Sequence, residues 1–600
     1  MNHSGRLLAG SLLILSFLSL TLLAIYVHMV YLFNKQTWPE LFFWTFASAF
    51  SVSIMLLWIL DGSRKITLLA VFASAFIMIS LPFLRFHFYG TDLVGEYFVA
   101  DVTHELGKWT PERAAGGRIP LNWFLYQRPN ELLHRYFSTT SVTILPAVVS
   151  EVAGLSTRQV LWVLLSLVSM SVVIIGYLIV RICLGHRIAA LSSIVFIFSS
   201  FYTAKFPMVL REDVALLFLL LSVFCILRGG GKFLLISLVS LMLLPMSHYA
   251  LVYFAFLFLL FLFVSKKAYE NGIFANILRK VGLRISNDST ESMAMSKDLL
   301  LYSIVVGLCW LLFVAYSIFV ANLGGIGESF KVLLGLEPSS PSYFQKYVVF
   351  SSLGPFHTII QWLERVMAIF GLFLALKVCK NVKTFSFVVA EGGLLAVTLA
   401  LAFFPTMSLL YDLDRTMHVA LLGFSAFIAT TIFSISKNIG KLLAIIFVTL
   451  FLLETLQSPI QYSSVANLTR EEYIFSFTHA TAFYEPSDFY FAKWVESFTN
   501  ESAVFASDSN GYSLCLIAKR ICLEPLGANV SDTISLLESG KTDYFLVLSY
   551  LEDYMEFTSK NGTELQFNLT DIAKLLGSND LNRIYDNSRV RNFAHATPTP

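Results

Sequence analysis

The feature that most constrains this chain is a succession of long apolar segments joined by short polar loops. A helix needs about 20 apolar residues to cross the hydrocarbon core of a bilayer, and about thirteen segments approach or exceed that length. They lie at 7–32, 40–60, 66–84, 157–181, 188–204, 213–228, 232–246, 249–265, 299–321, 356–376, 385–404, 416–435 and 441–457. The first segment is too long for a typical signal-peptide core and lacks a clear small-residue cleavage site, so we interpret it as an anchor. The sequence therefore predicts a mainly α-helical, polytopic membrane bundle.

Composition narrows the class of protein further. The chain is 56% hydrophobic and 14% charged, whereas soluble globular proteins carry roughly a quarter charged residues. This excludes a cytosolic enzyme, a secreted soluble domain and a disordered scaffold. The 42 Lys and Arg residues against 40 Asp and Glu residues leave a net charge of +2, which is too small for a nucleic-acid-binding protein.

The basic residues of the short loops set the orientation, because Lys and Arg are enriched on the cytoplasmic side of membrane proteins. They fall in alternate loops, counted from a cytoplasmic N-terminus, and include Arg64, Lys65, Arg181, Arg187, Arg228, Lys232, Lys266, Lys267, Lys377, Lys380, Lys383, Lys437 and Lys441. This places 85–156, 205–212, 322–355, 405–415 and 458–600 outside a multi-pass protein of the plasma membrane. The assignment requires 232–246 and 249–265 to be separate spans, because a single span there would put the tail inside.

The polar tail predicts a domain of its own. We divide the chain into a membrane domain at 1–457, with a long external loop at 85–156, and a C-terminal external α/β domain at 458–600. Short apolar runs predict strands at 503–506, 521–523 and 544–548, and helices at 488–498, 532–538 and 571–576. Sequons for N-glycosylation, which suit an external domain, begin at Asn467, Asn500, Asn529, Asn561 and Asn568. Cys515 and Cys522 flank a predicted hairpin and form either an external disulfide or two buried thiols.

Charged residues gather at the outer ends of the apolar segments, and Glu391 is the main exception within a span. The richest cluster follows the third segment, where a helix is predicted from about residue 91 to 106. On that helix Asp92 and Glu96 are one turn apart and share a face. The alternative is that Asp92 only caps the helix and Glu96 only complements its dipole. The overall pattern favours a catalytic or binding site at the external membrane surface over a polar path across the bundle.

Four short stretches carry a resemblance to a known family. They are Gly90-Thr91-Asp92-x-x-Gly95-Glu96-Tyr97, Ser141 to Pro146, Ser247-His248-Tyr249 and Arg583 to Asn587. Together with the predicted bundle and external domain, they make the chain resemble GT-C-type glycosyltransferases, integral membrane enzymes that use polyprenyl-phosphate-linked sugars. Within that group the chain is most similar to an archaeal family of uncharacterised multi-spanning membrane proteins. The family's usual acidic pair is tighter than the spacing of Asp92 and Glu96 seen here.

The resemblance implies a reaction and roles for particular residues. A sugar would pass from a polyprenyl-phosphate-linked donor to a glycan, lipid or protein acceptor on the external face. Asp92 would be the catalytic base that removes or orients the proton of the acceptor hydroxyl, and Glu96 the second catalytic residue of the acidic pair. Positive groups must stabilise the leaving phosphate, and the candidates at external helix ends are Arg211, His248, Arg415 and Lys205. Glu212 and Asp213 form a second acidic cluster, and 411–418 holds a third. These carboxylates suit Mg²⁺ or Mn²⁺, although one sequence does not decide whether a metal is needed.

Each of these residues also has a plain structural interpretation. Arg211 and Arg415 would extend to the membrane interface or pair with neighbouring acids, and His248 would satisfy backbone groups at a helix break. Two other functions stay open at this point: a transporter or flippase for a lipid or glycan, and a non-catalytic surface protein anchored by the bundle. The loop 322–355 is a candidate lid or a plain surface loop.

Overall fold

The computed structural model describes residues 67–68, 71–72, 74–76, 79, 88–89, 91–109, 136–199, 202, 206–271, 293–315, 331, 354–379, 381–403, 413–435, 483–484, 492–497, 504–507, 521–523, 544–548, 556–558, 564–566, 581–586 and 590–595. The chain divides into two compact units. The first comprises 1–84 and 163–464, and the second comprises 85–162 and 465–600. The segment 85–162 therefore groups with the tail, whereas the sequence analysis assigned it to the membrane domain. The predicted division at 457/458 itself stays a prediction.

The first unit is a bundle of apolar helices. Its described helices are α8 (Thr157–Leu184, which begins in the second unit), α9 (His186–Ile197), α11 (Leu210–Arg228), α12 (Gly231–Ser247), α13 (Leu251–Glu270), α15 (Lys297–Phe313), α17 (Gly354–Val378), α18 (Val382–Phe403) and α20 (Leu413–Ile435). Every apolar segment predicted between 157 and 435 overlaps one of these helices. Among the described residues, four helices are long and apolar enough to cross a membrane: Thr157–Leu184, Leu251–Glu270, Val382–Ala400 and Thr416–Ser434. The prediction of thirteen spans is not tested in full, because 7–32, 40–60 and 441–457 lie outside the described residues.

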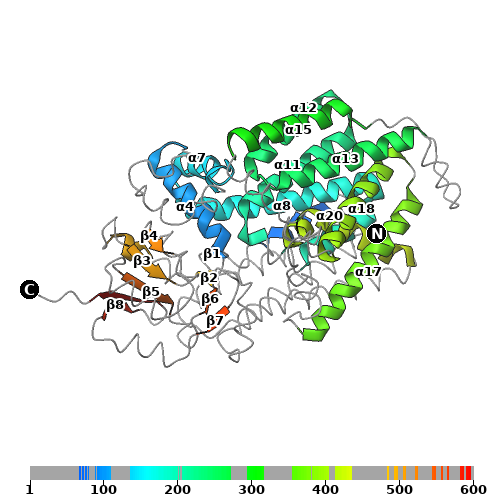
Figure 1. The fold of residues 1–600 in the computed structure, drawn as a ribbon. Coiled ribbons are helices and arrows are strands. Elements are labelled where there is room, and N and C mark those ends of the chain that lie inside the picture. Colours follow the sequence, from blue (N-terminus) through cyan, green and yellow to red (C-terminus); the bar gives the residue numbers. More distant parts are fainter. Residues whose placement is uncertain are drawn as a thin grey trace, which may run out of the picture. The chain divides into compact units, whose positions relative to one another are not determined.

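The helices pack through apolar side chains and a few small residues. α11, α12 and α15 lie side by side, and α18 and α20 pack together (Figure 1). Where α17 meets α20, a Cβ added to Gly371 would lie only 1.8 Å from the carbonyl oxygen of Phe427. A glycine is therefore required at this crossing, as is usual where helix backbones approach closely in membranes. Glu391 is buried inside the bundle, with its carboxylate against Gly423 of α20, so the main charged residue within a predicted span faces protein.

The break between α12 and α13 separates the two short apolar segments whose status decides the orientation. α12 ends at Ser247 after Pro245, His248 is extended, and α13 begins at Leu251. Two distinct helices are thus present, as the predicted orientation requires. Which faces of the membrane their ends reach stays a prediction.

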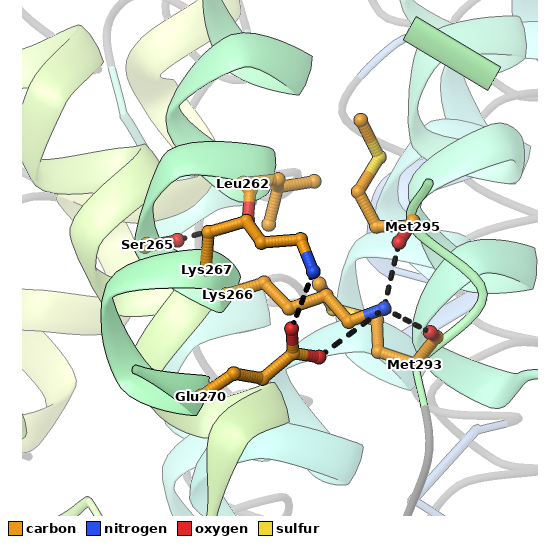
Figure 2. A network of polar contacts seen from close by, with 7 residues as sticks. All are labelled: Leu262, Ser265, Lys266, Lys267, Glu270, Met293 and Met295. Carbon is orange, nitrogen blue, oxygen red and sulfur yellow. Dashed lines mark hydrogen bonds and ion pairs between the residues drawn. The ribbon is translucent and has the colours of Figure 1, made fainter. Parts of the chain in front are cut away.

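At the other end of α13, one lysine holds the segment that leads into α15. Lys266 Nζ donates to the carbonyl oxygens of Met293 at 3.1 Å and Met295 at 2.7 Å, and lies 3.7 Å from Glu270 (Figure 2). Lys267 Nζ lies 2.8 Å from Glu270 Oε2. Ser296 then caps α15 by accepting a hydrogen bond from the Leu299 N–H. Lys266 thereby gives two backbone carbonyls a charged hydrogen-bond donor.

The second unit combines two helices with strands from both parts of the chain. α4 (Thr91–Leu106) and α7 (Ile144–Ala153) pack together, and β1 (Phe88–Tyr89) pairs antiparallel with β2 (Phe483–Tyr484). The tail contains β3 (Val504–Ser507), β4 (Ile521–Leu523), β5 (Tyr544–Leu548), β6 (Glu556–Thr558), β7 (Glu564–Gln566), β8 (Leu581–Asp586) and β9 (Val590–His595). These form a five-stranded sheet of order β4-β3-β5-β9-β8 and a separate β6–β7 pair. In the five-stranded sheet β3 is parallel to β4 and β5, while β9 is antiparallel to β5 and β8.

The strand predictions in the tail are confirmed, because β3, β4 and β5 lie where the apolar runs placed them. A helix at 492–497 falls within the predicted 488–498. The predicted helices at 532–538 and 571–576 lie outside the described residues, so the assignment of an α/β domain stays a prediction.

Candidate functional site

The first candidate site lies at the start of α4, in the second unit. The predicted helix from 91 to 106 is confirmed as α4, and Asp92 lies in its first turn, where a carboxylate is stabilised by the unpaired N–H groups of the helix end. Asp92 is half-buried, whereas Glu96, one turn later, is fully buried. Only Asp92 of this acidic pair therefore has exposed surface available to a substrate.

A tyrosine distant in sequence fixes the Asp92 carboxylate. Tyr136 is buried, and its hydroxyl donates a hydrogen bond to Asp92 Oδ1. The Tyr136 ring fits because residue 95 is a glycine: an added Cβ there would lie 2.8 Å from the ring atoms Cε2 and Cζ. The family-like stretch around Asp92 thus contains the space for a partner that sequence reasoning missed. Nothing in the spacing of the two residues, 44 apart, signals the contact.

Further contacts hold the segment that begins at Tyr136 against α4. Trp109 Nε1 donates to the carbonyl oxygen of Phe137 at 2.8 Å, and the Phe137 ring meets that of Phe98 edge to face. On the other side of α4 the Tyr97 hydroxyl donates to Asp101 at 3.4 Å. Burial, followed by the nearby Asp101 carboxylate, raises the pKa of Tyr97 well above its usual value, so that this hydroxyl stays neutral. These contacts fix α4 and the residues around Tyr136, which position Asp92.

The second candidate site is a buried charged cluster in the first unit, which we call the carboxylate–histidine cluster: Ser169, Arg211, Glu212, Asp213, His248 and His418. All six members are 4% exposed or less, with Arg211 at 2% and Ser169, Asp213 and His248 at 0%. They come from α8, the first turn of α11, the break before α13, and α20. Charges so placed in an apolar bundle are costly unless they are paired.

Two carboxylate–histidine pairs organise the cluster. Asp213 Oδ1 lies 3.1 Å from His418 Nε2, and Asp213 Oδ2 accepts a 2.8 Å hydrogen bond from Ser169. Glu212 Oε1 lies 3.3 Å from His248 Nε2. The Leu251 N–H donates to His248 Nδ1 at 3.2 Å, so this nitrogen carries no proton and the Nε2 that faces Glu212 does when the ring is neutral. His248 therefore accepts a backbone hydrogen bond at the helix break, as its structural interpretation predicts, and also contacts the charged cluster.

Of the four residues predicted to bind the donor phosphate, the structure describes the side chains of two. Arg211 and His248 are brought together with Glu212 and Asp213, but their burial leaves no accessible surface for a donor in this conformation. Arg415 lies in the first turns of α20, and its side chain is outside the described residues, as is all of Lys205. His418 and Ser169 were not nominated; the acidic cluster at 411–418 hinted at His418, but no sequence signal points to Ser169.

Several other predictions lie outside the described residues. These are Cys515 and the side chain of Cys522, together with the sequons at Asn467, Asn500, Asn529, Asn561 and Asn568. Within the described part of the chain, no three His, Cys, Asp or Glu side chains are grouped as ligands for a metal ion. A Mg²⁺ or Mn²⁺ requirement stays a prediction.

Comparisons with known proteins give structural neighbours at low identity. No protein-family model and no curated protein matches the chain. The crystal structure of the oligosaccharyltransferase of Archaeoglobus fulgidus tethered with an acceptor peptide is 12% identical, covers 84% of this chain and 74% of its own, and has a TM-score of 0.44. ArnT from Cupriavidus metallidurans bound to undecaprenyl phosphate is 12% identical, covers 89% of this chain and 98% of its own, and has a TM-score of 0.46. The arabinofuranosyltransferase AftD from Mycobacteria is 11% identical, covers 89% and 40%, and has a TM-score of 0.40.

These neighbours are GT-C glycosyltransferases. With identities of 11–12% and TM-scores below 0.5, they do not by themselves assign a family, donor or acceptor to this chain. The similarity to an archaeal family of uncharacterised membrane proteins stays a prediction.

Proposed function

We propose that this protein is a membrane glycosyltransferase that moves a sugar from a polyprenyl-phosphate-linked donor to an acceptor at the external membrane surface. The observation that carries the proposal is the setting of Asp92: a half-buried carboxylate in the first turn of α4, held by the Tyr136 hydroxyl, in the segment that follows an apolar stretch. A base for an acceptor hydroxyl must be oriented and accessible. Asp92 meets both conditions, whereas Glu96 is fully buried and so fails the second.

The chemical step follows from these groups. Asp92 accepts the proton of the acceptor hydroxyl, and the acceptor oxygen forms a bond to the anomeric carbon. The bond from that carbon to the phosphate oxygen breaks, and polyprenyl phosphate leaves with the electron pair. Positioned base catalysis contributes about 10²- to 10⁴-fold, and stabilisation of the leaving phosphate supplies more.

We assign the leaving phosphate to the basic candidates of the first unit, Arg211, His248, Arg415 and Lys205. For Arg211 and His248 this role requires the carboxylate–histidine cluster to open, because both side chains are buried in the described conformation. Arg211 has the bidentate geometry that phosphate oxygens favour. For His248, donor binding would then exchange the Glu212 carboxylate for a phosphate partner.

A transporter or flippase is the second candidate, and one observation favours it. Glu391 is 2% exposed within α18, and its carboxylate lies against Gly423 of α20. Intramembrane acids of this kind mark ion and substrate paths in many membrane proteins. The acid at the start of α4 has no role in such a path, so the glycosyltransferase accounts for more of the molecule.

The test uses the purified full-length protein in lipid vesicles with radiolabelled sugar donors. Wild type, Asp92→Asn and Glu391→Gln are compared on polyprenyl-monophosphate sugars, polyprenyl-pyrophosphate sugars and nucleotide sugars. Glu105→Gln, an exposed acid on the same helix as Asp92, is the matched control. We expect transfer from a polyprenyl-linked donor in wild type, Glu391→Gln and Glu105→Gln, and its loss in Asp92→Asn. Donor translocation without transfer, abolished by Glu391→Gln, would replace the enzyme with the flippase.

A further inference from the structure

α7 carries an apolar stripe that the second unit leaves exposed. Leu145, Val148 and Val152 are 38%, 54% and 83% exposed, and at 100° per residue they fall within an arc of about 60°. The opposite side of the helix buries Pro146, Ala147 and Ser150. A helix with one face packed on its own unit and an apolar face turned outward indicates an interaction surface.

The connection to the next helix fixes where this stripe lies along the chain. Gly154, with φ of 65°, closes α7, and the Ser150 hydroxyl donates to the carbonyl oxygen of Leu155 at 2.5 Å. Ser156 and Gln159 then cap α8 reciprocally, since each backbone N–H donates to the side chain of the other. α8 begins at Thr157 and is one of the helices able to cross a membrane. The end of α7 is thus held three residues from the start of a candidate span.

The length of α7 and the residues beside it indicate that the exposed stripe contacts the membrane surface. Ten residues of helix extend about 15 Å, half of the roughly 30 Å hydrocarbon core, so α7 cannot cross the bilayer. Arg158 lies over the Trp162 ring at 5.2 Å in the first turns of α8. Trp162 is half-buried, and a tryptophan at the start of a span is typical of the membrane–water interface. At the edge of the stripe Glu151 faces away toward His104 of α4, at 3.3 Å.

We propose that the stripe of α7 docks on the bilayer itself, with Leu145, Val148 and Val152 inserted at the boundary between head groups and acyl chains. Interfacial helices bury their apolar face about 5–10 Å into this layer. Because α4 packs on α7, docking also fixes the height of Asp92 above the lipid. This second consequence rests on the proposed function; the docking itself does not.

Depth-dependent quenching tests the docking directly. An environment-sensitive fluorescent amino acid is placed at position 148 or 152 of the full chain in phosphatidylcholine–phosphatidylglycerol vesicles, with position 105, an exposed site on α4, as the control. Lipids with a nitroxide near the head group should quench positions 148 and 152 at least twofold more than position 105, and aqueous iodide should quench them less. Iodide quenching equal to that at position 105 would place the stripe in water. Quenching by neither reagent would place it under protein. Either result overturns the proposal.

A second measurement addresses the height of Asp92. Val148→Asp combined with Val152→Asp should raise the KM for a long-chain donor in vesicles at least tenfold, with kcat for a short-chain donor in detergent unchanged; Glu151→Gln is the control. If neither wild type nor any variant transfers sugar, the proposed function is wrong. The quenching result still decides whether α7 docks on the bilayer. Normal KM in vesicles for the double variant would show that docking does not position the site.

Discussion

Replacing Gly95 with alanine should disable the Asp92 site while sparing the fold. The new Cβ would lie 2.8 Å from two ring carbons of Tyr136 and 3.1 Å from its hydroxyl oxygen. Carbon atoms pack at about 3.5–4.0 Å, so the ring must move by roughly 1 Å. The atoms that clash are the far end of the side chain, which also carries the hydrogen bond to Asp92. A displacement of this size removes the hydrogen bond that orients the carboxylate.

The expected magnitudes separate stability from activity. Alanine is favoured over glycine within a helix by up to about 1 kcal/mol, which offsets part of the roughly 1–3 kcal/mol of overpacking. The hydrogen bond to a charged group contributes about 1.5–3 kcal/mol, which corresponds to roughly 10- to 150-fold in rate. We therefore expect Gly95→Ala to fold with a stability loss of at most about 3 kcal/mol, and its kcat/KM to fall by that factor.

The assay measures sugar transfer and thermal unfolding for Gly95→Ala, Tyr136→Phe and the double variant. Because both changes remove the same hydrogen bond, the double variant should lose little more activity than either single one. Glu105→Ala, on the same helix but exposed, should have wild-type activity. Full activity in Gly95→Ala, or losses that multiply in the double variant, would refute the reasoning.

Three further predictions concern the framework that holds the sites. Lys266→Met should lower the free energy of unfolding by about 1.5–3 kcal/mol, because it removes a charged donor from the carbonyls of Met293 and Met295. Lys267→Met, at an exposed ion pair, should cost less than about 1 kcal/mol. Equal losses of the two variants in thermal unfolding would contradict this. Gly371→Ala should destabilise at or beyond the roughly 3 kcal/mol upper end for overpacking, because its Cβ meets the Phe427 backbone, while Gly231→Ala meets nothing; similar melting temperatures for the two would be the contrary result. Asp213→Ala should cost about 3–5 kcal/mol because it removes the buried carboxylate that His418 and Ser169 contact. Ser171→Ala, at a half-buried serine that bonds only its own helix among the described contacts, should have a small effect. A mild Asp213→Ala variant would show that the cluster is not a paired unit.

The helices of the bundle were accessible from the sequence because one physical requirement dominates them. A segment that lies in lipid must be apolar for about 20 residues, and the segments between 157 and 435 all correspond to helices. The helix at 91–106 and strands β3, β4 and β5 were found from capping residues and short apolar runs. Strands β8 and β9 were missed, because their residues mix polar and apolar side chains without alternation.

The sequence analysis predicted the acidic residues of the two sites but missed the residues that contact them. Acids at the ends of apolar segments stand out in a sequence, so Asp92, Glu212 and Asp213 could be named. Their partners Tyr136, Ser169 and His418 are ordinary residues brought in from other helices by long-range packing. Burial was the other missing quantity: helix-end positions suggested accessible Arg211 and His248, yet contacts among several helices enclose both.

The central claim is that Asp92 takes the proton of the acceptor in a sugar transfer from a lipid-linked donor. A single-turnover comparison tests it most directly, with wild type and Asp92→Asn saturated with the donor that the panel identifies, and with donor binding measured in parallel. The account predicts unchanged donor binding and a transfer rate reduced by about 10²- to 10⁴-fold in Asp92→Asn. Equal transfer rates in the two proteins would contradict it.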